Sequence, residues 1–112
     1  MSIGTHPDNT VTEKLGKLAE LYKQGEVSPM VTRTLDKLLA YETEECQRQL
    51  GEVNADLSAF EQKYGLASEE FYQQFRAGQT DDRMDFVEWA SLIQMAQNLR
   101  ERLDLLTGKK NV

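Results

Sequence analysis

The sequence predicts an all-α fold in which a long central helix forms an antiparallel helical hairpin, with a short crossing helix and an N-terminal helix. Apolar residues recur at helical spacing along most of the chain. No proline interrupts the stretch from Pro29 to Tyr64, which is long enough for the central helix. Gly25, Gly65 and Gly78 follow apolar-periodic segments, where a glycine typically ends a helix.

Length and composition predict a small globular protein. With 112 residues, the chain suits one domain, and we expect a flexible tail over residues 1–9 and a single helical domain over 10–112. No apolar run approaches the roughly 20 residues that a membrane span needs, and the N-terminus lacks the pattern of a signal peptide. The single cysteine, Cys46, fits a reducing compartment, so we expect a cytoplasmic protein.

The charge balance bears on the class of partner. The formal net charge is −6, and the basic residues are scattered, so no stripe of them follows a phosphate backbone. Nucleic-acid binding is therefore not expected. A negative surface attracts a basic partner, but it also keeps a protein soluble, and net charge alone does not separate these roles.

The N-terminal helix is predicted from a start signal and a stripe. Residues 10–13 (TVTE) match a capping box, in which a threonine and a glutamate satisfy free backbone amides. The apolar stripe that follows is Val11, Leu15, Leu18 and Tyr22. Gly25 is placed to end this helix, which would be about 21 Å long at 1.5 Å per residue.

The central helix is predicted to start at Ser28-Pro29, because serine caps helices and proline suits the first helical position. It would be about 55 Å long. Its apolar residues form a heptad seam: Leu39, Cys46, Val53 and Phe60, with Leu50, Leu57 and Tyr64 out of phase. Asp36 and Thr43 weaken the seam near its start.

Two further helices are predicted beyond Gly65. Ser68 is placed to cap the short one, which Gly78 closes, and Asp85 and Glu88 have the spacing of a capping box at the start of the last. The last helix, from Met84 to about Thr107, carries two apolar stripes: Phe86, Trp89, Ile93 and Ala96, and Leu92, Met95, Leu99, Leu103 and Leu106. Such a wide apolar arc indicates contact with more than one neighbour.

These lengths suggest a thin arrangement. The last helix would be about 36 Å long, so the first and last helices could both fold back along the central one, end to end. A ribbon two helices wide leaves part of its apolar face without cover. We therefore expect either dimerisation or a protein partner.

Little in the sequence indicates catalysis, a cofactor or a metal. The one histidine, His6, lies in the predicted tail, and no glycine-rich phosphate loop is present, so we expect no enzyme and no cofactor. Cys46 lies on the heptad seam, where packing is the expected role of a free cysteine. Asp81, Asp82, Asp85 and Glu88 form an acidic group that does not match a calcium loop, and two of these carboxylates are interpreted as helix caps.

All of the aromatic residues except Tyr22 and Tyr41 lie between Phe60 and Trp89. They could lock the hinge between the helices, which is the usual role of aromatics at helical spacing. They are also enriched among the residues that dominate protein interfaces. The predicted interaction site therefore comprises Phe60, Tyr64, Phe71, Tyr72, Phe75, Phe86 and Trp89.

Four motifs occur in order along the chain: TLDKLLAYE (34–42), DLSAFEQKYG (56–65), SEEFYQQFRAG (68–78) and DFVEW (85–89). Over residues 33–107 the chain resembles a family of small helical bacterial proteins, frequent in cyanobacteria and commonly encoded beside a toxin-like partner of the TumE type. The resemblance implies an antitoxin that binds and neutralises its neighbour, and it assigns no catalytic residues. The segment before Val31 falls outside the resemblance, and Met30 could be an internal start.

Two hypotheses follow. In the first, the protein is an antitoxin that uses the motif aromatics and the acidic edge to bind a basic toxin. In the second, it is a self-associating helical adaptor without a toxin partner, dimerising along Leu50, Val53, Leu57 and Phe60.

Overall fold

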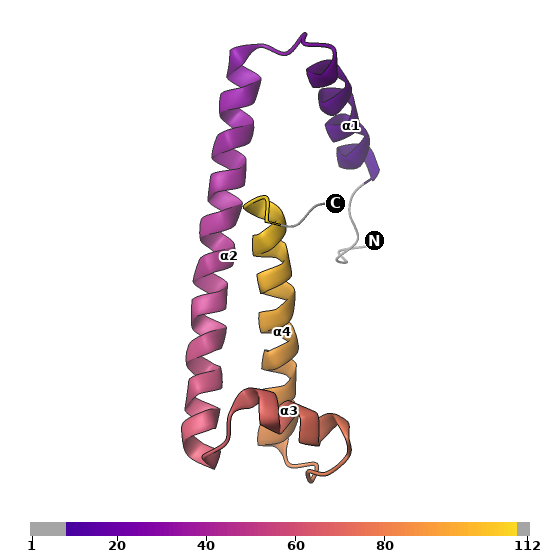
Figure 1. Ribbon diagram of the computed structural model, residues 1–112. Coiled ribbons are helices and arrows are strands. Elements are labelled where there is room, and N and C mark those ends of the chain that lie inside the picture. The colour runs from indigo at the N-terminus through magenta and orange to yellow at the C-terminus, as the bar shows by residue number, and fades with distance from the viewer. Residues whose placement is uncertain (1–8, 110–112) are drawn as a thin grey trace. The chain divides into compact units, whose positions relative to one another are not determined.

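The computed structural model describes residues 9–109, and this range contains four helices and no strand. The helices are α1 (Asn9–Lys23), α2 (Pro29–Tyr64), α3 (Ser68–Arg76) and α4 (Met84–Leu106) (Figure 1). The predicted all-α fold is confirmed. Of the predicted tail, residues 1–8 lie outside the described residues, and residue 9 is the first of α1. None of the described helices combines the length and apolar character that a membrane crossing requires.

The chain divides into two compact units, residues 1–38 and residues 39–112. The first unit contains α1 and the first turns of α2. No residue of α1 is buried. Of its predicted stripe, Val11, Leu15 and Tyr22 are exposed and Leu18 is half-buried. α2 begins at Pro29 as predicted, and the carbonyl of Ser28 accepts a hydrogen bond from the amide of Val31 at 3.0 Å.

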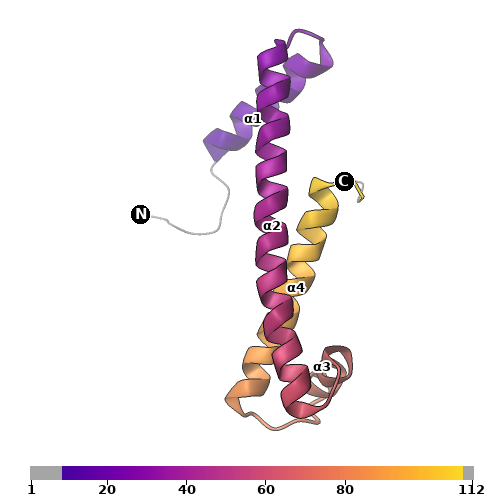
Figure 2. The same cartoon turned by 90° about the vertical axis from the view of Figure 1, so that its left-hand side faces the viewer.

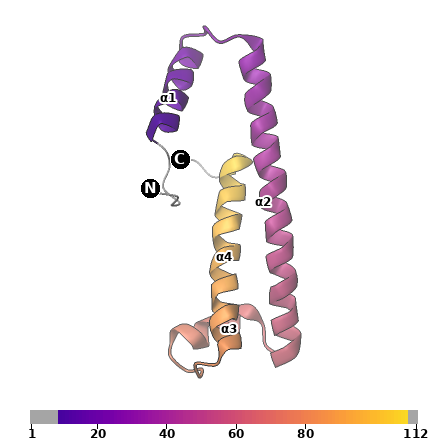
Figure 3. The ribbon, with the colours of Figure 1, turned by 180° about the vertical axis from the view of Figure 1, so that it is seen from behind.

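The second unit is a helical hairpin. The part of α2 from Leu39 onward lies antiparallel beside α4, and α3 lies across the closed end of the pair (Figures 1, 2 and 3). Two contacts set the register of the hairpin. The thiol of Cys46 donates a hydrogen bond to the carbonyl of Leu99 at 3.2 Å, and the rings of Phe60 and Trp89 stack at 5.6 Å between centroids. The predicted hairpin with a crossing helix is therefore confirmed.

The core of this unit follows most of the predicted heptad seam. Its buried residues are Cys46, Val53 and Leu57 of α2, Phe71 of α3, and Trp89, Ala90, Ile93, Ala96 and Leu99 of α4. Leu39 departs from the prediction, because its side chain is 51% exposed. Since Cys46 lies opposite Leu99, Leu39 lies opposite the final turn of α4, where the cover that α4 provides ends.

Glycines allow the two turns at the closed end. Gly65 and Gly78 have φ angles of 62° and 71°, a region that residues with a Cβ atom rarely adopt. After each glycine, a backbone amide reaches back to a free helix carbonyl, from Leu66 to Glu61 at 3.3 Å and from Gln79 to Gln74 at 2.9 Å. This pattern is the Schellman motif, and both helix ends were predicted at these glycines.

The predicted side-chain caps of the last two helices are wrong. The N-cap residues are Ala67 for α3 and Arg83 for α4, and neither makes a side-chain capping hydrogen bond. The side chains of Ser68 and Asp85 bond instead to residues distant in sequence. Hydrogen bonds to residues distant in sequence thus replace local capping by these two side chains. Sequence spacing alone does not reveal such bonds.

Candidate protein-interaction site

Most of the predicted aromatic residues meet around one tryptophan at the closed end of the hairpin. The Trp89 ring stacks on Phe71 with 3.9 Å between centroids and 2° between planes. Phe60 and Tyr64 of α2 stack on Trp89 at 5.6 and 5.8 Å. Phe86 lies 5.3 Å from Phe71 and 5.1 Å from Tyr64. We call these residues, with Phe75, the aromatic cluster: Phe60, Tyr64, Phe71, Phe75, Phe86 and Trp89.

Burial decides what this cluster can do. The side chains of Trp89 and Phe71 are 0% and 1% exposed, so they cannot contact a partner without opening the fold. Phe60, Tyr64 and Phe86 are half-buried and pack against the core. The indole nitrogen Nε1 of Trp89 donates a hydrogen bond to Ser68 Oγ at 2.9 Å, so its polar atom is satisfied internally. The aromatic cluster therefore locks the hinge, the first of its two proposed roles.

Tyr72 lies outside this cluster, on the face shared by α3 and α4. Its hydroxyl accepts a hydrogen bond from Gln94 Nε2 at 3.1 Å, and the guanidinium of Arg76 lies 5.8 Å from its ring centroid. Tyr72 and Phe75 are half-buried and line one wall of a shallow groove. The other wall belongs to α4, and the groove has a volume of about 480 Å³. The full set of lining residues is Tyr72, Phe75, Arg76, Val87, Ala90, Ser91 and Gln94.

The outer face of α4 carries apolar residues that sequence reasoning did not assign to the site. Met84, Val87 and Met95 are 78%, 44% and 49% exposed. Together with Ser91 they are spaced by three, four and four residues, so they form one stripe along the helix. Met95 was predicted to be part of a buried stripe, and its exposure corrects that prediction. We call Met84, Val87 and Met95 the outer α4 row.

The spacing of this row could have been read from the sequence. It was hidden because α4 has apolar residues on almost every side, so no polar face marks the solvent boundary. Only the register of α4 against α2 shows which stripe is left outside.

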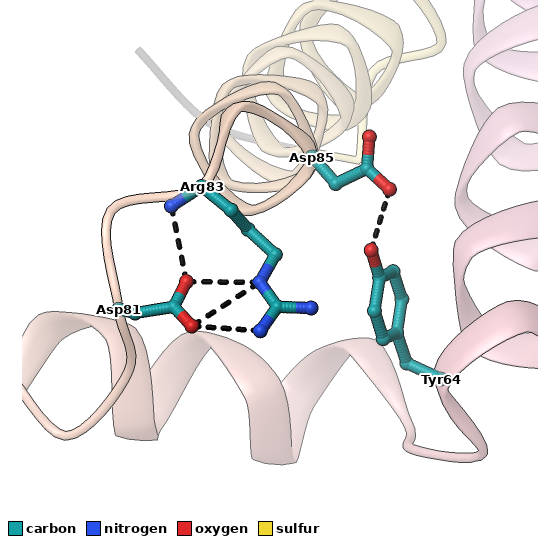
Figure 4. Close-up of polar contacts among 4 residues, drawn as sticks. All are labelled: Tyr64, Asp81, Arg83 and Asp85. Atoms are coloured by element: carbon teal, nitrogen blue, oxygen red, sulfur yellow. Dashed lines mark hydrogen bonds and ion pairs between the residues drawn. The ribbon is translucent and has the colours of Figure 1, made fainter.

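The acidic group of the sequence is partly engaged in ion pairs (Figure 4). Asp81 accepts hydrogen bonds from the backbone amide and the guanidinium of Arg83, at 2.7 to 3.2 Å. These bonds lower the pKa of Asp81 to about 2. Asp85 Oδ2 accepts from Lys63 Nζ at 2.7 Å and from the hydroxyl of Tyr64 at 2.5 Å. The lysine, and then the tyrosine hydroxyl, lower the pKa of Asp85.

These contacts give two carboxylates of the acidic group a role other than helix capping. Asp85 joins α4 to the end of α2, and Asp81 orders the turn before α4, so neither carboxylate is free for a basic partner. Asp82 and Glu88 are exposed. Among the described residues, no three His, Cys, Asp or Glu side chains are grouped so that they could hold a metal ion. Cys46 is 3% exposed and lies in the core, as its predicted packing role requires.

The seam proposed for self-association is already occupied within the chain. Val53 and Leu57 are buried, and Leu50 and Phe60 pack against the same core. A homodimer along these residues would have to displace α4 from α2. Surfaces that remain available in this unit include the outer α4 row and the groove between α3 and α4.

Comparison of the chain with models of known protein families, with curated proteins and with solved structures finds no match. The resemblance of residues 33–107 to the antitoxin-like family therefore stays a prediction, and the function is argued from the surfaces described above.

Proposed function

We propose that this protein is a non-catalytic binding module of the antitoxin type, which neutralises a basic toxin-like protein encoded beside it. The observation that carries the proposal is the outer α4 row, Met84, Val87 and Met95, exposed next to the groove between α3 and α4. The contact surface is then this row with Tyr72 and Phe75, and not the buried rings of Phe71 and Trp89.

The outer α4 row supports binding because of its position on an unusually apolar helix. One face of α4 supplies Trp89, Ile93 and Ala96 to the core, while the row lies on another face. Helices that are apolar all round are typically buried on all sides. Exposed apolar side chains gathered on one stripe, and next to a groove, are typical of a protein-binding surface.

The net charge of the whole chain indicates which charge to expect on the partner. At a net charge of −6, the protein attracts a basic partner over several ångströms and speeds their encounter. This electrostatic attraction sets the rate and selectivity of association, and the outer α4 row supplies the tight contact. The single cysteine, Cys46, and the family resemblance support the bacterial cytoplasm as the proposed location of this activity.

Co-expression with the product of the adjacent gene tests the proposal. The full-length protein should restore growth of cells that express the toxin and should co-purify with it as a stable complex. The double variant Val87→Gln/Met95→Gln should lose both effects while keeping its helical content. The control is Leu15→Gln in α1, which removes a similarly exposed apolar side chain (54%, against 44% for Val87 and 49% for Met95) outside the proposed surface.

The absence of rescue and of a complex with the unmodified protein would reject the antitoxin role. The alternative is a self-associating adaptor, which predicts a stable homodimer without any toxin. Light scattering at micromolar concentration separates the two, since the antitoxin role does not require a dimer along Leu50, Val53, Leu57 and Phe60.

A further inference from the structure

A second groove lies where α2, α3 and α4 meet. Its volume is about 640 Å³, and it shares only Tyr72 with the groove described above. Leu57, Ile93 and Ala96 form its floor, and all three are buried. Except for Ala67, the surrounding residues are polar, so the groove has an apolar floor and a mostly polar rim, as ligand sites usually do.

The two long walls of this groove are in register. α2 contributes Asn54, Leu57, Ser58 and Glu61, and α4 contributes Ile93, Ala96, Gln97 and Arg100. Each set follows the spacing i, i+3, i+4, i+7, which is one face of a helix over two turns. Two turns correspond to about 10 Å of helix. The groove therefore follows two antiparallel helices, and Ala67, Ser68, Glu69, Tyr72 and Gln73 line it from the start of α3.

The two ends of the groove carry opposite charge. Arg100 lies at the end where its guanidinium approaches Asn54 Oδ1, at 3.5 Å. Glu61 and Glu69 lie at the other end, beside the start of α3. Glu61 Oε2 accepts a hydrogen bond from the amide of Ser68 at 2.9 Å, which fixes the position of its carboxylate. Glu69 and Arg100 are exposed and able to meet charges on a ligand.

We propose that this groove binds one helix of a partner protein, whose contacting face carries a basic residue and an acidic residue about two turns apart with apolar residues between them. The basic residue meets Glu61 and Glu69, the acidic residue meets Arg100, and the apolar residues cover Leu57, Ile93 and Ala96. The docked helix completes a three-helix bundle with α2 and α4.

A helix fits these walls better than an extended segment. The backbone groups of α2 and α4 are hydrogen-bonded within their own helices, so the walls offer no row of free amides and carbonyls to pair with a strand. A helix satisfies its own backbone and needs only side-chain contacts. Its ridges also match the i, i+3, i+4 grooves that α2 and α4 present.

A tryptophan next to the groove can report on binding. The chain contains a single tryptophan, Trp89, and its indole nitrogen donates to Ser68 Oγ at 2.9 Å, while Ser68 lines the groove. An occupant that contacts Ser68 changes the surroundings of this hydrogen bond. Tryptophan fluorescence and the NMR resonance of the indole N–H therefore both follow binding.

The test uses the full-length protein and three synthetic peptides, each stapled as a helix. One carries glutamate at i, leucine at i+3 and i+4, and lysine at i+7; the others carry lysine or glutamate at both charged positions. The bipolar peptide should bind at least tenfold more tightly than either like-charged peptide. In NMR spectra, binding of this peptide should shift the resonances of the Trp89 indole N–H and of the backbone amides of Leu57, Ile93 and Ala96.

Charge inversion at one end sharpens the test. Arg100→Glu makes both ends of the groove negative, so the preference should change to the peptide with two lysines. Arg102→Glu, an equal charge change at an exposed position of α4 outside the groove, should leave the bipolar preference intact. Circular dichroism confirms folding, and Arg100→Gln provides a milder variant that should reduce the bipolar preference without inverting it.

The proposal is overturned if the bipolar peptide shows no preference, if Arg100→Glu leaves the ranking unchanged, or if an unstapled proline-containing version binds equally well. The probes contain no toxin sequence. Failure of this inference is therefore distinguishable from failure of the antitoxin role, which the co-expression experiment tests.

Discussion

The aromatic cluster and the outer α4 row both include residues of α4, and they differ in burial and in the contacts that they make. Trp89, at the centre of the cluster, is 0% exposed and stacks on rings from α2 and α3, whereas Met84, at the start of the row, is 78% exposed. The most conspicuous residues of the sequence are thus used to hold the helices together. The less conspicuous aliphatic residues are left on the surface, where they can meet a partner.

Replacing the central ring should break the cluster. Trp89→Ala removes a fully buried side chain that contacts Phe60, Tyr64 and Phe71, and we expect it to destabilise the protein by about 3–5 kcal/mol. Urea unfolding followed by circular dichroism measures this loss. Tyr41→Ala, at a side chain that is 63% exposed, is the control and should change stability by less than about 0.5 kcal/mol. Equal losses in the two variants would show that the cluster is not the core.

The hydrogen bond beneath the cluster should have a smaller effect. Ser68→Ala leaves the buried indole N–H of Trp89 without its acceptor, at a cost of about 1–3 kcal/mol. Ser58→Ala removes the hydroxyl of an exposed serine on α2 and is the matched control, with an expected change below about 0.5 kcal/mol. Thermal unfolding compares the two. A Ser68→Ala protein as stable as the control would mean that the indole finds another acceptor, such as water.

The ion pairs at the closed end should make the smallest contribution and should depend on pH. Lys63 and Tyr64 lower the pKa of Asp85, and Arg83 lowers that of Asp81 to about 2. A lowered carboxyl pKa stabilises the folded state above the unfolded value of about 4, and this stability is lost as the pH falls through the folded value. Stability should therefore decrease between about pH 4 and pH 2.

A variant separates this effect from general acid denaturation. Asp85→Asn should reduce the loss of stability as the pH falls below about 4, compared with the unmodified protein. The pairs are exposed, so added salt should weaken the Asp85 contribution as well. If Asp85→Asn and the unmodified protein gave identical pH profiles, the pair with Lys63 would make no net contribution.

The fold was largely predictable from the sequence because its signals are local. Pro29, Gly65 and Gly78 set helix boundaries through their own backbone preferences, and the structure places the boundaries there. The heptad seam also predicted that Cys46 and Val53 face a neighbouring helix. These properties depend on residues within one or two turns, which a sequence displays directly.

The candidate site was less predictable because it depends on register. Ser68 and Asp85 have the spacing of helix caps, yet Trp89 and Lys63 engage them across the hairpin. Met95 belongs to an apolar stripe that any observer would assign to the core, yet it lies outside. Which stripe of α4 faces α2 is decided by how the large aromatic rings fit together, and sequence spacing does not contain that information.

Stability and the proposed binding reside on opposite faces of α4. The most direct test measures both quantities, by urea unfolding and by titration with the product of the adjacent gene, in two variants. Val87→Gln/Met95→Gln should lower affinity at least tenfold and change stability by less than about 1 kcal/mol. Trp89→Phe should lower stability by more than this and leave the affinity of the folded protein unchanged. Normal binding by the row variant, or weaker binding by a Trp89→Phe protein that remains folded, would contradict this separation of the two faces.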